Sequence, residues 1–69
     1  MICEKVGKRI KQLRKAMNIS QEELEDIANV HRTYIASLEV GKRNVSIVTL
    51  EKIVKALKVS MSEFFEFSV

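Results

Sequence analysis

Apolar residues recur at spacings of three and four along most of the chain, which is the period of a helix with one buried face. Proline is absent and glycine occurs only twice, so few positions oppose helix formation. The pattern predicts an all-α fold, a compact five-helix bundle. The first helix carries the apolar stripe Ile2, Val6, Ile10, Leu13 and Met17, and the second carries Leu24, Ile27 and Ala28.

Capping signals divide the rest of the chain into four shorter helices. The starts of three of them are marked by the S-x-x-E capping boxes Ser20 with Glu23 and Ser60 with Glu63, and by Ser46 as an N-cap. Asn29 can adopt the left-handed conformation that ends a helix, and Gly41 provides the next such stop. We therefore expect the second and third helices to meet across a tight turn, and the fourth to end at about Leu57.

The length of the chain allows a single domain, residues 1–69, with a small core. Surface scaling lets about 60% of the chain surface be buried, which favours a partner. No apolar run approaches the ~20 residues that span a bilayer, and the first residues lack the basic-then-apolar layout of a secretory signal. We expect a cytoplasmic protein with no membrane segment.

Side chains for metal or covalent chemistry are scarce. One His and one Cys provide no pair at metal-ligand spacing, and two glycines cannot form a phosphate-binding loop. His31 is expected to be a turn or capping residue, and Cys3 to be partly buried. Because no nucleophile combines with a base and a pocket, we expect no enzyme, no metal site and no cofactor.

The charges are segregated along the chain, whose formal net charge is +3. Residues 1–16 carry six basic side chains and one acidic side chain, whereas residues 17–30 carry four acidic side chains and no basic one. Basic surface beside a compact helical unit is one electrostatic feature of nucleic-acid binding.

The third helix has an outer face of small and polar residues. Successive residues turn by 100°, so Ile35 and Leu38 point toward the core, and Thr33, Ser37 and Val40 point nearly opposite. A helix used only for packing normally presents Lys and Glu outward, because these side chains solvate well and favour helix. Small side chains instead allow close approach to another molecule.

The run SQEELEDIANVHRTYIASLEVGKRN, residues 20–44, resembles the helix-turn-helix of the lambda-repressor and Cro-like family. Through HRTYIASLE, GKRNVSI and EFF it is most similar to the controller proteins of restriction-modification systems. The resemblance implies a homodimeric transcription regulator that binds a pseudo-palindromic DNA operator and regulates its own gene. An antitoxin-type or phage-type repressor of the same fold is the alternative.

The resemblance also assigns DNA contacts to individual residues. Arg32, Thr33 and Tyr34 begin the recognition helix, whose first residues meet base edges in the major groove. A guanidinium can bond guanine O6 and N7 together, and a Thr methyl can meet a thymine methyl. The alternatives are that Arg32 pairs with a nearby carboxylate and that Tyr34 packs toward the first helix. Ser37 is either a further contact or a solvated residue.

Backbone contacts are assigned to Gln21, at the start of the second helix, and to Arg43 and Asn44, in the loop after the third. Simple capping and a solvated turn are the alternatives. The family commonly has Ser at the place of Ala36 and a basic or polar residue at that of Val40, so one or two backbone contacts are expected to be missing.

Two further pairs of residues concern structure and assembly. Arg14 and Glu39 correspond to the family's ion pair between the first and third helices, and Phe64 and Phe65 are divided between the monomer core and a twofold interface. The acidic group of the second helix is either a solvated face or a contact for RNA polymerase; its members are Glu22, Glu23, Glu25 and Asp26.

Overall fold

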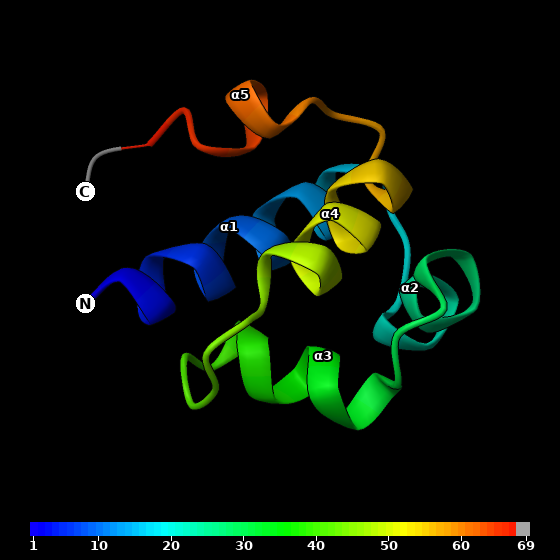
Figure 1. The fold of residues 1–69 in the computed structure, drawn as a ribbon. Helices are drawn as coiled ribbons and strands as arrows, with labels where there is room; N and C mark the ends of the chain where they lie inside the picture. The colour runs from blue at the N-terminus through cyan, green and yellow to red at the C-terminus, as the bar shows by residue number, and fades with distance from the viewer. Residues whose placement is uncertain (68–69) are drawn as a thin grey trace.

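The computed structural model describes residues 1–67, which form five helices and contain no strand. The helices are α1 (Ile2–Ala16), α2 (Gln21–Ala28), α3 (Arg32–Glu39), α4 (Ile47–Ala56) and α5 (Met61–Phe64). Figure 1 shows α5 on one side of α1 and α4, with α3 on the opposite side. The all-α, five-helix prediction is therefore confirmed over the described residues.

The helix ends lie where the capping signals place them. The Glu23 amide donates to Ser20 Oγ at 3.0 Å, and Ser60 and Glu63 form the same reciprocal box at α5. Asn29 ends α2 with φ of 57° and Gly41 follows α3 with φ of 75°. Both positions require the left-handed region, which Gly and Asn enter more easily than other residues.

One core receives side chains from all five helices. Its largest fully buried members are Ile10, Leu24, Ile35, Leu38, Ile53, Val54 and Phe64. Ile27 was expected to pack with its neighbours on α2, but 56% of it is exposed. That part of the prediction is wrong because α2 buries only one narrow face, through Leu24 and Ala28.

The backbones of α1 and α3 lie in direct contact at Gly7. A Cβ atom on Gly7 would overlap the carbonyl oxygen of Leu38, so no larger residue fits without a shift of backbone. Glycine at this position allows the two helices to approach more closely than side chains would permit. The position of α3 is thus fixed from behind by α1.

Phe64 belongs wholly to the core, with no exposed surface. Its assignment to a twofold interface is therefore wrong, because a side chain without surface cannot contact a second subunit. Phe65, which caps α5, is 41% exposed, and its ring meets that of Phe64 edge-on at a centroid distance of 5.0 Å. Arg9 holds this end of the chain on α1 by donating to the carbonyl oxygens of Glu63 and Phe64.

Candidate nucleic-acid interface

The turn between α2 and α3 sets the start of α3. His31 is the N-cap, and its Nδ1 accepts a hydrogen bond from the Thr33 amide at 3.1 Å. The expectation that His31 is a capping residue is confirmed. Its ring satisfies one of the free amides at the helix start, so the first turn of α3 is ordered before any partner binds.

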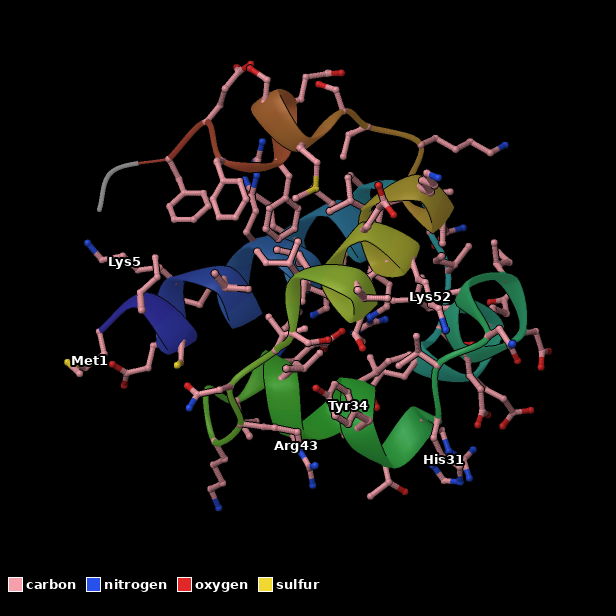
Figure 2. The ribbon with its side chains drawn as sticks, viewed as in Figure 1. Met1, Lys5, His31, Tyr34, Arg43 and Lys52 are labelled. Atoms are coloured by element: carbon pink, nitrogen blue, oxygen red, sulfur yellow. The ribbon has the colours of Figure 1, made fainter. Side chains whose placement is uncertain are left out.

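The outer side of α3 carries small side chains. Thr33 is exposed and Ser37 is half-buried, while Ile35 and Leu38 on the opposite side are buried. The Ser37 hydroxyl donates to the Thr33 carbonyl oxygen at 3.0 Å. Figure 2 shows α3 along one side of the molecule, with His31 near its start and Tyr34 on it.

Arg32 lies at the start of α3 in an exposed ion pair. Its Nη1 donates to Glu22 Oε2 on α2 at 2.7 Å, and the Arg32 and Glu22 side chains are 55% and 68% exposed. The backbone amide of Arg32 donates to the Glu25 carboxylate at 3.0 Å. The structure thus has the carboxylate pairing that the sequence left open. One ion pair still leaves most of the five guanidinium N–H donors for other acceptors.

Tyr34 connects α3 to the loop that follows it. The Tyr34 hydroxyl donates to the Asn44 carbonyl oxygen at 3.3 Å, and the Arg43 guanidinium lies 4.7 Å from the ring centroid. Asn44 Oδ1 accepts from the thiol of Cys3, which is half-buried as expected. These contacts hold Arg43 and Asn44 beside the outer side of α3, and Figure 2 shows Arg43 adjacent to Tyr34.

Gln21, the first residue of α2, is tied to a buried ion pair. Arg14 donates from Nε to Glu39 Oε2 at 2.7 Å and from Nη2 to Glu39 Oε1 at 3.0 Å, so the pair expected between the first and third helices is present. Gln21 Nε2 donates to the same Glu39 Oε1 at 3.1 Å. The hydrogen bond from Glu39 raises the pKa of Arg14, against the lowering effect of burial.

Two of the six basic residues of the first segment have structural roles. Arg14 is buried in its ion pair, and Arg9 holds α5. The positive charge near the start of the chain is therefore weaker evidence for DNA binding than the sequence alone indicated. Three exposed basic residues lie at the start of α3 or in the loop that follows it: Arg32, Lys42 and Arg43.

Sequence reasoning missed the part that the acidic residues of α2 play in holding α3. Glu22 and Glu25 are three residues apart, which places them on the same side of a helix. That spacing indicates from the sequence alone that the two carboxylates can contact one neighbouring element. Their partners at the start of α3 depend on the angle between the two helices, which local pattern does not give.

Exposed apolar side chains surround a surface pocket of about 330 Å³, and none of the residues that line this pocket belongs to α3. We call the group Ile2, Ile47 and Phe65, from α1, α4 and the end of α5, the Phe65 patch. Cys3, Arg43 and Asn44 also line this pocket, so the patch adjoins the loop that carries two of the expected DNA contacts.

Metal-binding and membrane-spanning features are lacking in the part of the chain that the structure describes. Within residues 1–67, no three His, Cys, Asp or Glu side chains group in a way that could hold a metal ion. Across the same range, every helix is too short or too polar to cross a membrane.

The sequence matches a known family and several curated proteins. A family model described as helix-turn-helix matches residues 10–64. Over 63 residues the chain is 43% identical to the control protein C.BamHI of Bacillus amyloliquefaciens. The aligned region covers 90% of this chain and 78% of that protein.

Solved structures of controller proteins superpose closely on this chain. The restriction-modification controller protein C.AhdI from Aeromonas hydrophila gives a TM-score of 0.87 at 38% identity, covering 91% of this chain and 96% of that one. The controller protein C.Esp1396I was solved as a tetramer in complex with its natural 35 base-pair operator. It gives a TM-score of 0.90 at 41% identity, covering 96% of this chain and 87% of that one.

Proposed function

Since the chain belongs to the helix-turn-helix family, we propose that it is the controller protein of a restriction-modification system. In this role it is a cytoplasmic transcription regulator, not an enzyme, and needs no cofactor. It binds a pseudo-palindromic operator as a homodimer and regulates its own gene. The observation that carries the proposal is the outer side of α3, which combines an Arg and small polar residues and is fixed by the core behind it.

Base recognition falls to the first turns of α3. Arg32 can bond guanine O6 and N7, and the exposed Thr33 methyl can meet a thymine methyl. Tyr34 has its hydroxyl on the loop, so we assign it a stacking or phosphate contact at the groove edge rather than a base contact. Ser37 lies one turn further along α3. Its hydroxyl donates to the Thr33 carbonyl oxygen and can still accept a hydrogen bond from a base.

Backbone contacts fall to the residues on either side of α3. Gln21 is at the amino-terminal end of α2, where free amides and the helix dipole favour a phosphate oxygen. Its side chain is oriented by Glu39, which leaves the second amide hydrogen available. Arg43 and Asn44 supply phosphate donors from the loop held by Tyr34.

A dimer follows from the size of the molecule. Half-sites read by paired helix-turn-helix units lie about 34 to 36 Å apart. The described part of the chain spans 29 Å along its longest principal axis and has one α2–α3 unit, so one copy reads one half-site. We propose that the Phe65 patch forms the twofold contact, because it gathers apolar side chains that are exposed in the single chain.

Footprinting of the DNA upstream of its own gene tests the proposed function. We expect protection of two half-sites, with affinity falling by about 10³ to 10⁵ between 50 and 200 mM salt if 6 to 10 phosphates are contacted. Failure to bind any duplex in dilute buffer, or binding that does not depend on salt, contradicts the proposal.

Two substitutions separate base reading from backbone contact in the same assay. Arg32→Ala is expected to relax the preference at one base pair by about 1 to 3 kcal/mol. Arg43→Ala is expected to weaken binding to all sequences alike and to reduce the salt dependence by about one phosphate contact. An Arg32→Ala variant with unchanged base preference removes Arg32 from the readout.

Genes beside the reading frame separate the controller from its alternative. A methyltransferase and an endonuclease frame are expected next to it, whereas a toxin frame indicates an antitoxin-type repressor and a phage gene cluster a phage-type one. All three bind DNA through the same side of α3, so the footprint alone does not distinguish them.

Contact with RNA polymerase is a further part of the proposal, and it rests on Asp26. Glu23 caps α2, and Glu22 and Glu25 hold the start of α3, so replacing any of these three also disturbs the fold or the DNA contacts. Asp26→Ala is the cleaner variant. Loss of activation with unchanged operator binding supports the contact, and unchanged activation removes it.

A further inference from the structure

We propose that His31 is a further specificity-determining residue, which donates a hydrogen bond from its Nε2–H group to a guanine in the major groove. The inference rests on the proposed function and deepens it, because it adds a base contact at the start of α3. Capping of α3 occupies only one ring nitrogen of His31. The second nitrogen makes the proposed contact.

The cap at the start of α3 determines which ring nitrogen of His31 carries the proton. Nδ1 accepts a hydrogen bond from the Thr33 amide at 3.1 Å, so Nδ1 has no proton of its own. In a neutral imidazole the proton is then on Nε2, which donates and cannot accept. An uncapped histidine can present either a donor or an acceptor, whereas His31 presents only a donor to DNA.

The same cap sets the direction of the Nε2–H donor. The two nitrogens of an imidazole point away from each other, so a ring whose Nδ1 faces the Thr33 amide turns Nε2 away from the helix. His31 is exposed, and within residues 1–67 its Nε2 has no hydrogen-bond acceptor. Figure 2 shows His31 at the outer edge of the molecule, where α3 begins. The donor is therefore oriented and available before DNA binds.

The neighbours of His31 place this donor at the base-reading end of α3. Arg32 and Thr33, the next two residues, are the proposed base contacts, and the first residues of a recognition helix meet base edges. The His31 ring is bonded to the backbone of Thr33 itself. Successive base pairs are about 3.4 Å apart, so a donor beside Thr33 can reach the base pair that Thr33 contacts or the next one.

A side chain that only donates distinguishes the bases by their acceptors. Guanine presents N7 and O6 side by side in the major groove, whereas adenine has an amino donor next to its N7. Cytosine presents an amino donor, and thymine has a methyl group near its O4. An N–H donor is therefore bound best by guanine and worst by cytosine.

His31→Ser removes the ring donor and keeps the cap. Ser already caps α2, α4 and α5 in this chain, each time by accepting from the amide three residues further along. We expect the melting temperature of His31→Ser to equal that of the wild type. Affinity for a duplex that the wild-type chain selects from a random pool is expected to fall about 2- to 10-fold, whereas affinity for sonicated DNA of mixed sequence stays the same.

His31→Ala is the matched control for capping, because it removes both the ring donor and the cap. It is expected to lower the melting temperature as well as the affinity for the selected duplex. The difference between the two variants separates the loss of the cap from the loss of the donor.

Single base-pair changes in the selected duplex locate the contact. The wild type is expected to discriminate against replacement of one particular guanine, and His31→Ser to lose that discrimination. Arg32→Ala is expected to relax the preference at another base pair. If both variants relax the same base pair, His31 acts only through Arg32.

Nitrogen NMR tests the position of the proton in the unmodified protein. His31 is the only His of the chain, so its ring signals are unambiguous. At mildly alkaline pH, where an imidazole is neutral, we expect the proton on Nε2. The Nε2 signal is expected to shift when the selected duplex binds.

Five results overturn the role of His31 and leave the proposed function intact. They are unchanged affinity of His31→Ser for the selected duplex, an equal loss on both DNAs, which indicates a phosphate contact, relaxation at the Arg32 base pair, a proton on Nδ1, and an Nε2 signal that the selected duplex does not shift. A wild-type chain that selects no sequence at all overturns both the role of His31 and the proposed function.

Discussion

Glu39 is the residue on which the arrangement of the first three helices depends. It accepts two hydrogen bonds from Arg14 on α1 and one from Gln21 on α2, and it lies at the end of α3. Arg14 also donates to the Ile19 carbonyl oxygen between α1 and α2. A single carboxylate thus fixes the three elements that carry the candidate DNA contacts.

This ion pair is not expected to make stability depend on pH near neutrality through Arg14. Glu39 raises the pKa of Arg14 in the folded chain. A raised pKa contributes stability at every pH below the unfolded value, and that stability is lost only as the pH rises through the folded value. Arginine titrates far above neutral pH, so its contribution is constant over the working range.

Glu39→Ala is expected to reduce the free energy of unfolding by about 3 to 5 kcal/mol, because it leaves the buried Arg14 guanidinium without its partner. Urea denaturation measures the change. Glu51→Ala on the exposed side of α4 is the control, with an expected change within about 0.5 kcal/mol. A loss of less than about 1 kcal/mol in Glu39→Ala would show that the site repacks without the pair.

At the scale of the element, contacts local in sequence were predictable and contacts between helices were not. Ser20, Asn29 and Ser60 were assigned correctly because a cap depends only on residues within one turn. The Arg32 partner was left open because Glu22 is ten residues away and meets it only across the α2–α3 angle.

Burial of single residues also escaped prediction where it depends on packing. Phe64 and Phe65 are neighbours with the same side chain, yet one is fully buried and the other 41% exposed. The difference arises where α5 ends and Arg9 holds its last carbonyl oxygens. The helical period of the sequence carries no information about that contact.

At the contact between α1 and α3, helix propensity and steric overlap predict opposite changes in stability for Gly7→Ala. In a helix interior, Gly7→Ala by propensity alone would stabilise the protein by about 0.5 to 1 kcal/mol. We expect it instead to destabilise by about 1 to 3 kcal/mol, because the new methyl group overlaps the Leu38 carbonyl oxygen. Thermal unfolding reads the sign directly, and an increase in melting temperature would show that α1 and α3 can separate.

At the scale of the whole molecule, the outer side of α3, where we propose that DNA binds, and the Phe65 patch are made of different residues and are connected by one loop. Arg43 and Asn44 contact Tyr34 on α3 and also line the pocket that the patch surrounds. On our proposal two copies join through the patch, and the outer side of α3, which supplies none of the residues lining this pocket, meets DNA.

Phe65→Ala is expected to weaken the dimer by about tenfold, because each of the two Phe65 side chains has 41% of its surface left to bury and full burial contributes roughly 1.5 to 3 kcal/mol. Sedimentation equilibrium measures the dimer constant. Ile27→Ala, an exposed apolar residue on α2 outside the patch, is the control and should leave that constant unchanged. If both variants dimerise like the wild type, the twofold contact lies elsewhere.

The close approach at Gly7 has a consequence for the nucleic acid. With backbone pressed on backbone and Glu39 clamped at its end, α3 has little freedom to tilt or slide when it meets an imperfect groove. The DNA then has to adjust to the protein. The stiffness and curvature of the duplex at base pairs that no side chain contacts should therefore influence the affinity for a site.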